Sequence, residues 1–122
     1  LDMNRDIRDL WAEALRGGRY EQATGQLAGG TQGVPRFCCL GVLCDLHSSV
    51  THHDWQGDTY LGEDCLLPGM VAKWAGLCDG QILGDGSTTV EVRHEGGDTT
   101  LADLNDKGVS FMDIADIIEE EL

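Results

Sequence analysis

The sequence predicts a single α+β domain over residues 1–122, mainly helical, built around a buried central helix with a small β-hairpin. Three observations lead to this expectation. The most apolar run, residues 37–46, holds three of the five cysteines. Apolar residues recur at helical spacing near the start and at the end of the chain. Two short apolar runs separated by a glycine-rich turn favour one hairpin near residues 81–93.

The first helix is expected to begin after Asn4, whose side chain suits an N-cap, and to end at Gly17-Gly18. Its apolar face consists of Ile7, Leu10, Trp11, Ala14 and Leu15. Leu1-Asp2 look like a cloning remnant, so Met3 is the expected natural start. Residues 20–35 are polar and rich in glycine, and we expect mostly loop there.

Residues 38–46 are expected to form the central helix, because Leu40, Leu43 and Leu46 recur at helical spacing. Periodicity alone does not separate a buried helix from a buried strand in so short a run. Asp45 and the polar residues that follow mark the expected end. A glycine inside a helix costs about 1 kcal/mol relative to alanine. Gly41 therefore indicates that another segment packs closely against the backbone there.

The region after the central helix, residues 47–66, is expected to be a long polar loop. Leu67-Pro68 then opens a helix that Gly76 closes. The hairpin is expected from strands at residues 82–83 and 90–92 with a turn over residues 84–87.

Two helices are expected at the end of the chain. Thr100 caps a short helix over residues 101–105, and residues 106–108 form a turn. Ser110 caps the last helix, with Asp113 in the capping-box position. Its apolar stripe is Phe111, Ile114, Ala115, Ile118 and Leu122. The predicted core residues are Leu10, Trp11, Leu15, Leu40, Leu43, Val71, Trp74, Phe111, Ile114 and Ile118.

The net charge of −14 limits the classes of partner. Binding to phosphates needs a basic face, so direct contact with nucleic acid or an anionic membrane is not expected. A basic protein surface or a metal ion is easier to accommodate, although acidic charge also simply keeps a small protein soluble. The cluster Glu119-Glu120-Glu121 is too small to establish mimicry of nucleic-acid charge.

The cysteines indicate a reducing, cytoplasmic setting. Their number is odd, and Cys38 and Cys39 are adjacent, an arrangement that disulfide geometry disfavours. No stretch approaches the roughly 18 apolar residues of a membrane span, and the first residues lack the apolar core of a signal peptide.

Four motifs resemble a family of small, uncharacterised bacteriophage and prophage proteins, mainly of actinobacteria. They are the Trp-containing helix and Leu-Arg-x-Gly-x-Tyr-x-Gln pattern in residues 11–22, Cys-Cys-Leu-Gly-Val-Leu-Cys at 38–44, Leu-Pro-x-x-Val-x-x-Trp-Ala-Gly-Leu at 67–77, and Leu-Asn-Asp-x-Gly-x-Ser-Phe-x-x-Ile-Ala-Asp at 104–116. The motifs occur in the same order across nearly the whole chain. Ala23 stands where a glycine usually follows Gln22, which puts a tight turn there in doubt. The resemblance implies a phage-related, intracellular origin.

A cysteine nucleophile is one candidate chemistry. Cys38 or Cys39 would need a base from His47, His52, His53 or His94, and Asn105 or Asp106 to orient it. The alternative catalytic set is Cys39 with Gln22 as oxyanion donor and Asn105. However, no histidine lies in the motifs, and an apolar environment makes a thiol inert. The simpler interpretation is that Cys38, Cys39 and Cys44 are small core residues.

Metal sites are weaker candidates, and no cofactor is expected. Cys44-x-x-His47 has zinc-ligand spacing, and the remaining ligands would come from His52, His53, Cys65 and Cys78. Standard zinc sites usually show two close pairs, and this sequence has one. A calcium loop beginning at Asp103 fails, because Ile114 stands where a glutamate is required. A helix-turn-helix in the same segment fails for want of a basic second helix.

A small polar ligand is the other possibility for the motif residues. Asn105-Asp106 suit an ordinary turn before Gly108, but they could also face the segment around Gln22 across the central helix. The predicted ligand-binding residues are Tyr20, Gln22, Cys39, Asn105 and Asp106.

The function predicted from these features is that of a phage accessory protein without catalytic activity. It would bind a host factor, either a protein or a small signalling molecule, in host takeover or against host defence, in the host cytoplasm. The alternative is a small cysteine-dependent or Gln/Asp-assisted hydrolase of a nucleotide-like or amide substrate.

Overall fold

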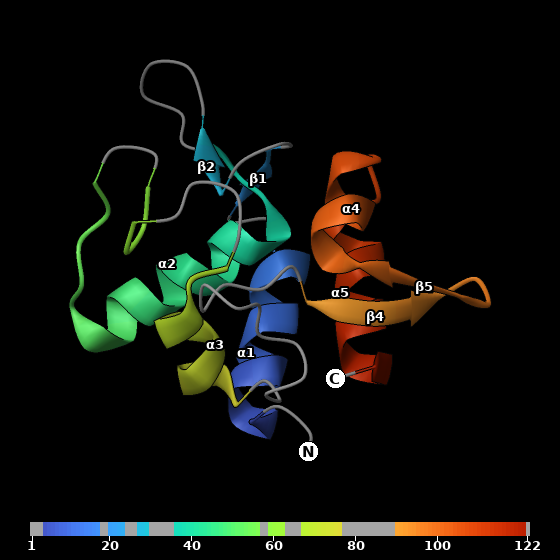
Figure 1. Cartoon of the computed structure of the whole chain (residues 1–122), viewed down its shortest axis with the longest axis horizontal. Coiled ribbons are helices and arrows are strands. Elements are labelled where there is room, and N and C mark those ends of the chain that lie inside the picture. The colour runs from blue at the N-terminus through green and yellow to red at the C-terminus, as the bar shows by residue number, and fades with distance from the viewer. Residues whose placement is uncertain are drawn as a thin grey trace.

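The part of the chain that the structure describes forms five helices, a small three-stranded sheet and a hairpin (Figure 1). The computed structural model describes residues 4–17, 20–23, 27–29, 36–56, 59–62, 67–76 and 90–121. In chain order the elements are α1 (Arg5–Arg16), β1 (Glu21–Gln22), β2 (Ala28–Gly29), β3 (Arg36–Phe37), α2 (Cys39–Thr51), α3 (Gly69–Ala75), β4 (Glu91–His94), β5 (Gly97–Thr100), α4 (Leu101–Asp106) and α5 (Phe111–Glu121). The predicted α+β class, mainly helical with one hairpin, is confirmed.

Helix α2 is the buried central helix that the sequence predicts, and it contacts α1, α3, α4 and β3. It is longer than expected, because it continues beyond Leu46 to Thr51 and ends at His52 in the left-handed conformation. The polar residues of this last turn find partners inside the fold. The His47 ring is 3% exposed, and the Thr51 hydroxyl donates to the His47 carbonyl at 2.7 Å. The assignment of residues 47–51 to a loop was therefore wrong.

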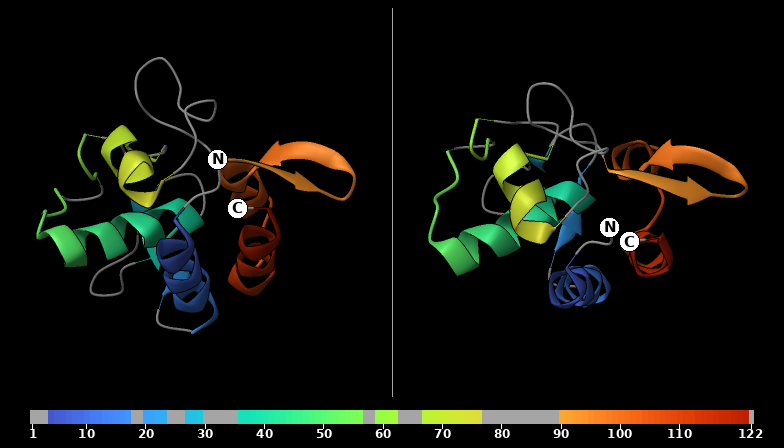
Figure 2. Two further views of the ribbon diagram at one scale, coloured as in Figure 1. Left: turned by 90° about the horizontal axis from the view of Figure 1, so that it is seen from below. Right: turned by 60° about the horizontal axis from the view of Figure 1, so that its bottom comes forward.

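Helices α1 and α5 lie side by side, as both views of Figure 2 show. Asn4 caps α1 as expected, with its side-chain oxygen accepting from the N–H of Ile7 at 3.1 Å. Leu10 was predicted in the core but is 42% exposed. Because Ala12 is buried as well, the inward face of α1 is centred between Trp11 and Leu15, and Leu10 lies at its edge.

The segment predicted as loop contributes two strands to a small sheet of order β1-β3-β2. Strand β1 pairs parallel with β3, and β2 pairs antiparallel with β3. This sheet leads directly into α2. The close approach expected at Gly41 is confirmed, because a Cβ there would lie 1.9 Å from the Leu27 carbonyl oxygen.

Helix α3 follows Pro68 and ends at Gly76, with a φ of 78°, as predicted. Trp74 was predicted in the core but is only partly buried, and its ring packs edge-on against His47 at 5.1 Å between centroids. The Leu67 and Val71 side chains are fully buried.

The hairpin lies later in the chain than predicted. Strand β4 includes two of the predicted strand residues, 91–92, but it pairs with β5, after the turn at Glu95-Gly96. Both turn residues have positive φ, which is the pattern of a type I′ hairpin turn. The glycines at 96 and 97 thus form the turn and the start of β5. The predicted strand at 82–83 and turn at 84–87 lie outside the described residues.

The two C-terminal helices agree with the sequence analysis. Thr100 caps α4 by accepting from the N–H of Asp103 at 3.1 Å, and Gly108 turns the chain with a φ of 89°. Ser110 accepts from the N–H of Asp113 at 3.3 Å at the start of α5. The inward residues of α5 are Phe111, Ile114, Ala115, Ile117 and Ile118. Leu122 lies outside the described residues.

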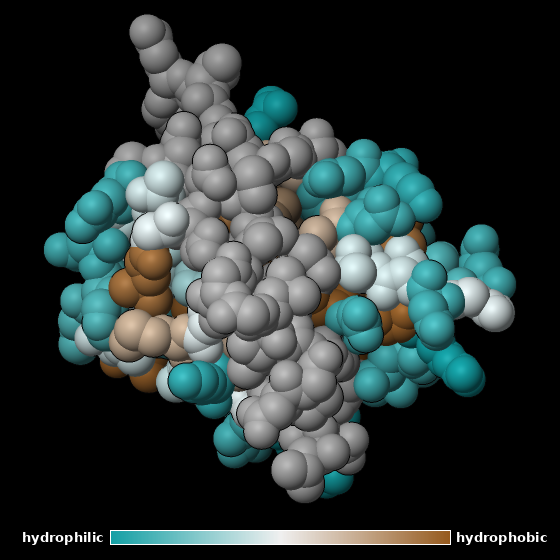
Figure 3. Space-filling view, in the orientation of Figure 1, coloured by the Kyte–Doolittle hydropathy of each residue, from teal (hydrophilic) through white to brown (hydrophobic). Residues whose placement is uncertain are grey.

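The core is continuous from α1 through α2 to α4 and α5. On the face shown in Figure 3, hydrophilic residues dominate the coloured surface, with hydrophobic atoms between them. None of the helices in the described ranges is long and apolar enough to cross a bilayer.

Candidate functional site

The three thiols of the Cys-Cys-Leu-Gly-Val-Leu-Cys motif lie in the core. Cys38 is 4% exposed, whereas Cys39 and Cys44 have no exposed surface, and all three are free. Cys38 caps α2, since its sulfur accepts from the N–H of Gly41 at 3.3 Å. The Cys39 thiol donates to the carbonyl of Leu101 at 3.5 Å. Each of these two sulfurs therefore has a structural partner.

Burial makes these thiols poor nucleophiles. The N–H groups of Gly41 and Leu40 favour a thiolate at Cys38, but loss of hydration is the larger effect and raises its pKa to about 11. Burial likewise raises the pKa of Cys39 and of Cys44 well above the usual range. At neutral pH these groups are protonated thiols.

The histidines do not supply a base for the thiols. His47 lies two turns beyond Cys39 on the same helix, about 12 Å along the axis at 1.5 Å per residue. Its Nδ1 is 2.6 Å from the Tyr60 hydroxyl, and its ring stacks on that of His53. His94 is on β4. Among the described residues no histidine hydrogen-bonds a cysteine sulfur.

Asn105 is the centre of a buried polar network that joins the termini of several elements. It has no exposed surface, and its Oδ1 accepts from the backbone N–H of Cys39 at 3.1 Å and from Gln22 Nε2 at 3.0 Å. Its Nδ2 donates to the carbonyl of Ala23 at 2.6 Å. Gln22 Nε2 also donates to the carbonyl of Val109 at 2.7 Å. We call this set the Gln22–Asn105 clasp.

The clasp brings together three of the five predicted ligand-binding residues, Gln22, Cys39 and Asn105. Their polar groups bind one another and the backbone, which is how buried amides remain satisfied without a ligand. A small polar ligand would have to displace these bonds. The clasp therefore has a structural use, tying β1 and α4 to the beginning of α2, and a ligand-binding role for it stays a prediction.

The other two predicted residues, Tyr20 and Asp106, are not among the groups that define the clasp. Tyr20 donates to Asp45 Oδ2 at 2.8 Å, and Trp55 Nε1 donates to Asp45 Oδ1 at 3.3 Å. Asp106 is exposed at the end of α4. The sequence analysis treated Asp45 only as a helix-end signal. No local sequence pattern predicts that Asp45 lies between two aromatic donors, because Trp55 is in a loop ten positions later.

The suggested zinc ligands do not gather in the part of the chain that is described. His47 Nδ1 lies 2.6 Å from the Tyr60 hydroxyl, so this nitrogen is already engaged in a hydrogen bond within the fold. No group of three histidine, cysteine or acidic side chains suited to a metal ion occurs among the described residues. Cys65 and Cys78 lie outside them.

Comparison with known proteins identifies the family. No curated protein and no solved structure matches the chain. A family model described as "Domain of unknown function (DUF8296)" matches residues 3–122. Because this match covers nearly the whole sequence, the chain belongs to the DUF8296 family.

Proposed function

We propose that this chain is a non-enzymatic accessory protein of a bacteriophage that binds a host protein in the host cytoplasm, in host takeover or against host defence. The observation that supports binding over catalysis is the burial of the cysteine motif. Its thiols are buried, their pKa values are raised, and the neighbouring amides of the clasp are engaged in holding the fold. The phage origin rests on the resemblance of the four motifs.

Charge supports a protein partner over a small signalling molecule. The chain carries −14 formal charges, and every described carboxylate except that of Asp45 belongs to an exposed residue. Nucleotides carry phosphate, so this surface repels them, whereas it attracts a basic protein surface and speeds association with it. The clasp adds to this preference, because its hydrogen-bonding groups are already paired within the chain.

The proposal can be tested with a matched pair of proteins, the natural chain and its Cys39→Ser variant. Serine is close to cysteine in size, and its hydroxyl can donate to the same Leu101 carbonyl, so the variant should fold. Each tagged protein is expressed in an actinobacterial host, cross-linked in the cell and analysed by mass spectrometry. The identified partner is then purified, and its affinity is measured by calorimetry at two salt concentrations.

We expect both proteins to bind the same host protein with equal affinity, and we expect added salt to weaken that binding. The hydrolase alternative predicts a different result. Turnover of an amide or nucleotide substrate by the natural chain, lost in Cys39→Ser, would replace the binding proposal with an enzymatic one.

A further inference from the structure

We propose that the host partner docks in a groove between the β4–β5 hairpin and helices α4 and α5, and that the docked part is a segment carrying lysine or arginine next to apolar side chains. This inference rests on the proposed function, because it names the surface and the partner chemistry for the same binding role.

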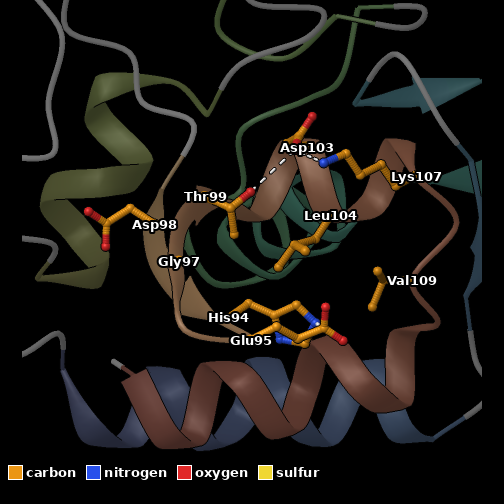
Figure 4. A pocket seen from close by; sticks show the side chains of 9 residues that line it. All are labelled: His94, Glu95, Gly97, Asp98, Thr99, Asp103, Leu104, Lys107 and Val109. Atoms are coloured by element: carbon orange, nitrogen blue, oxygen red, sulfur yellow. Dashed lines mark hydrogen bonds and ion pairs between the residues drawn. The ribbon is translucent and has the colours of Figure 1, made fainter.

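The groove consists of two adjoining hollows of about 420 and 550 Å³. Three residues, His94, Glu95 and Val109, line both hollows. Figure 4 shows the first, with Leu104 and Val109 facing His94 and Glu95 of the hairpin. Ile117 of α5 lines the second. The groove therefore has an apolar floor between a hairpin wall and a helical wall.

The rim of the groove is acidic. The carboxylates among its lining residues are Glu95, Asp98, Asp103, Asp113, Asp116 and Glu120. Some are already neutralised. Lys107 lies 2.9 Å from Asp103, and Arg16 pairs with Asp116. In Figure 4 the Asp98 carboxylate points away from the hollow.

Two carboxylates along one face of α5 are not neutralised by an ion pair in the described part of the chain. Asp113 and Glu120 have no cation within ion-pair distance among the described residues, and they lie seven positions apart, two helical turns, with Ile117 between them. Glu95 faces them from the hairpin, and its Oε1 lies 3.8 Å from Nε2 of His94. A chain entering the groove would therefore meet carboxylates on both walls and an apolar strip below.

The acidic rim and the apolar floor of the groove together fit one class of binding partner. A second copy of the chain carries −14 charges itself, and nucleic acid is also anionic, so both are repelled. The carboxylates do not group as metal ligands in the described residues. A basic segment with apolar side chains satisfies the charged rim and the apolar floor together.

The walls are held in place before binding. The backbone N–H of Arg93 donates to Glu121 Oε1 at 3.0 Å, which joins the hairpin to α5. Gln22 of the clasp donates to the carbonyl of Val109, and the N–H of Val109 donates to the carbonyl of Leu104. The motif residues therefore fix the floor of the groove, and a preformed groove reduces the ordering cost of docking.

The test uses a synthetic 14-residue peptide with lysine and leucine at helical spacing, and a control peptide with glutamate in place of lysine. Binding is followed by NMR on the full chain. The groove variant is Asp113→Asn with Glu120→Gln. The matched control, Glu13→Gln with Asp54→Asn, removes the same charge at exposed residues that do not line the groove.

We expect the lysine peptide to shift the amide signals of His94, Glu95, Val109 and Ile117, and the glutamate peptide to shift none. The groove variant should bind the lysine peptide about tenfold more weakly, and the control less than about twofold. Equal weakening in both variants would mean general charge attraction and would overturn the proposal, as would signal changes confined to another surface or no binding at all.

The two proposals fail in different ways. If the host protein recovered by cross-linking binds the groove variant as tightly as the natural chain, the groove proposal is wrong and the proposed function stands. If no partner is recovered and Cys39-dependent turnover is found, the proposed function itself is wrong.

Discussion

Substituting alanine for Gly41 tests the packing on which the position of α2 depends. The new Cβ would lie 1.9 Å from the carbonyl oxygen and 2.8 Å from the carbonyl carbon of Leu27. Both are backbone atoms, so no flexible side chain can move aside. The Leu27 carbonyl would have to retreat by about 1 Å in a closely packed interior, although it also accepts from the N–H of Cys38 at 3.1 Å.

The expected loss of stability combines three contributions. Overpacking costs about 1–3 kcal/mol, and the weakened hydrogen bond to Cys38 costs about 1 kcal/mol. Alanine is favoured over glycine inside a helix by about 1 kcal/mol, which offsets part of the loss. We therefore expect Gly41→Ala to lower the free energy of unfolding by about 1–3 kcal/mol, which corresponds to a Tm about 4–12 °C lower in a domain of this size.

Thermal and urea unfolding followed by circular dichroism would measure this effect. Gly97→Ala is the control, because a Cβ there meets its nearest neighbour, the His94 carbonyl oxygen, at an ordinary 3.9 Å. We expect the control to change the free energy of unfolding by less than about 0.5 kcal/mol. If Gly41→Ala were as stable as the natural chain, the close contact between α2 and Leu27 would be refuted.

Three further predictions concern buried polar groups. Asn105→Ala removes the acceptor of the Cys39 N–H, one of the two acceptors of Gln22 Nε2 and the donor to the Ala23 carbonyl. We therefore expect urea unfolding to show a free energy of unfolding lower by about 2–4 kcal/mol; a decrease below about 1 kcal/mol would contradict the clasp. Trp11→Phe removes the 2.9 Å hydrogen bond from the indole N–H to the Cys39 carbonyl. Urea unfolding should show a free energy of unfolding lower by about 1–2 kcal/mol, and no change would contradict this role. Burial and the neighbouring His53 lower the pKa of His47, so its contribution to stability is complete above about pH 6.5 and decreases as the pH falls through that value. The Tm should drop between about pH 7 and 5, and less so in His47→Gln; equal profiles would exclude His47 as the cause.

The helices could be predicted because their signals are local. Asn4, Thr100 and Ser110 each cap the helix that follows them, and Gly76 ends α3, as expected from the residue types alone. The unusual glycine at position 41 correctly indicated a close neighbour. The sequence did not show that Leu27 would be this neighbour, because its position depends on the pairing of β2 with β3, and strands of two residues have no sequence pattern.

The errors arise where tertiary contacts decide the outcome. Strands of two residues, such as β1 and β2, have no periodicity to detect. The polar end of α2 stays helical because His47 packs between the Tyr60 and Trp74 rings, which come from later segments. The hairpin turn at Glu95-Gly96 was overlooked because the sequence analysis placed the hairpin turn at the glycine-rich residues 84–87.

The candidate site was predicted in part. One of the two interpretations of Asn105-Asp106 was that they face the segment around Gln22 across the central helix, and the contacts of Asn105 with Gln22 and Cys39 agree with it. These contacts hold the fold together, and ligand binding by these residues stays a prediction. The groove residues Asp113, Ile117 and Glu120 were not identified, because helical spacing of acidic residues on α5 has the same appearance as an ordinary solvated face. Only the position of the hairpin opposite α5 distinguishes the two.

The central claim is that the Cys38, Cys39 and Cys44 thiols are buried structural groups, and their reactivity tests this claim most directly. The native protein is labelled with iodoacetamide between about pH 6 and 9, and mass spectrometry follows each cysteine separately. We predict that Cys38, Cys39 and Cys44 are labelled only at the rate at which the protein unfolds, and that denaturant accelerates all three. Rapid labelling of any one of them in the folded protein, with a midpoint below about pH 8, would contradict the account.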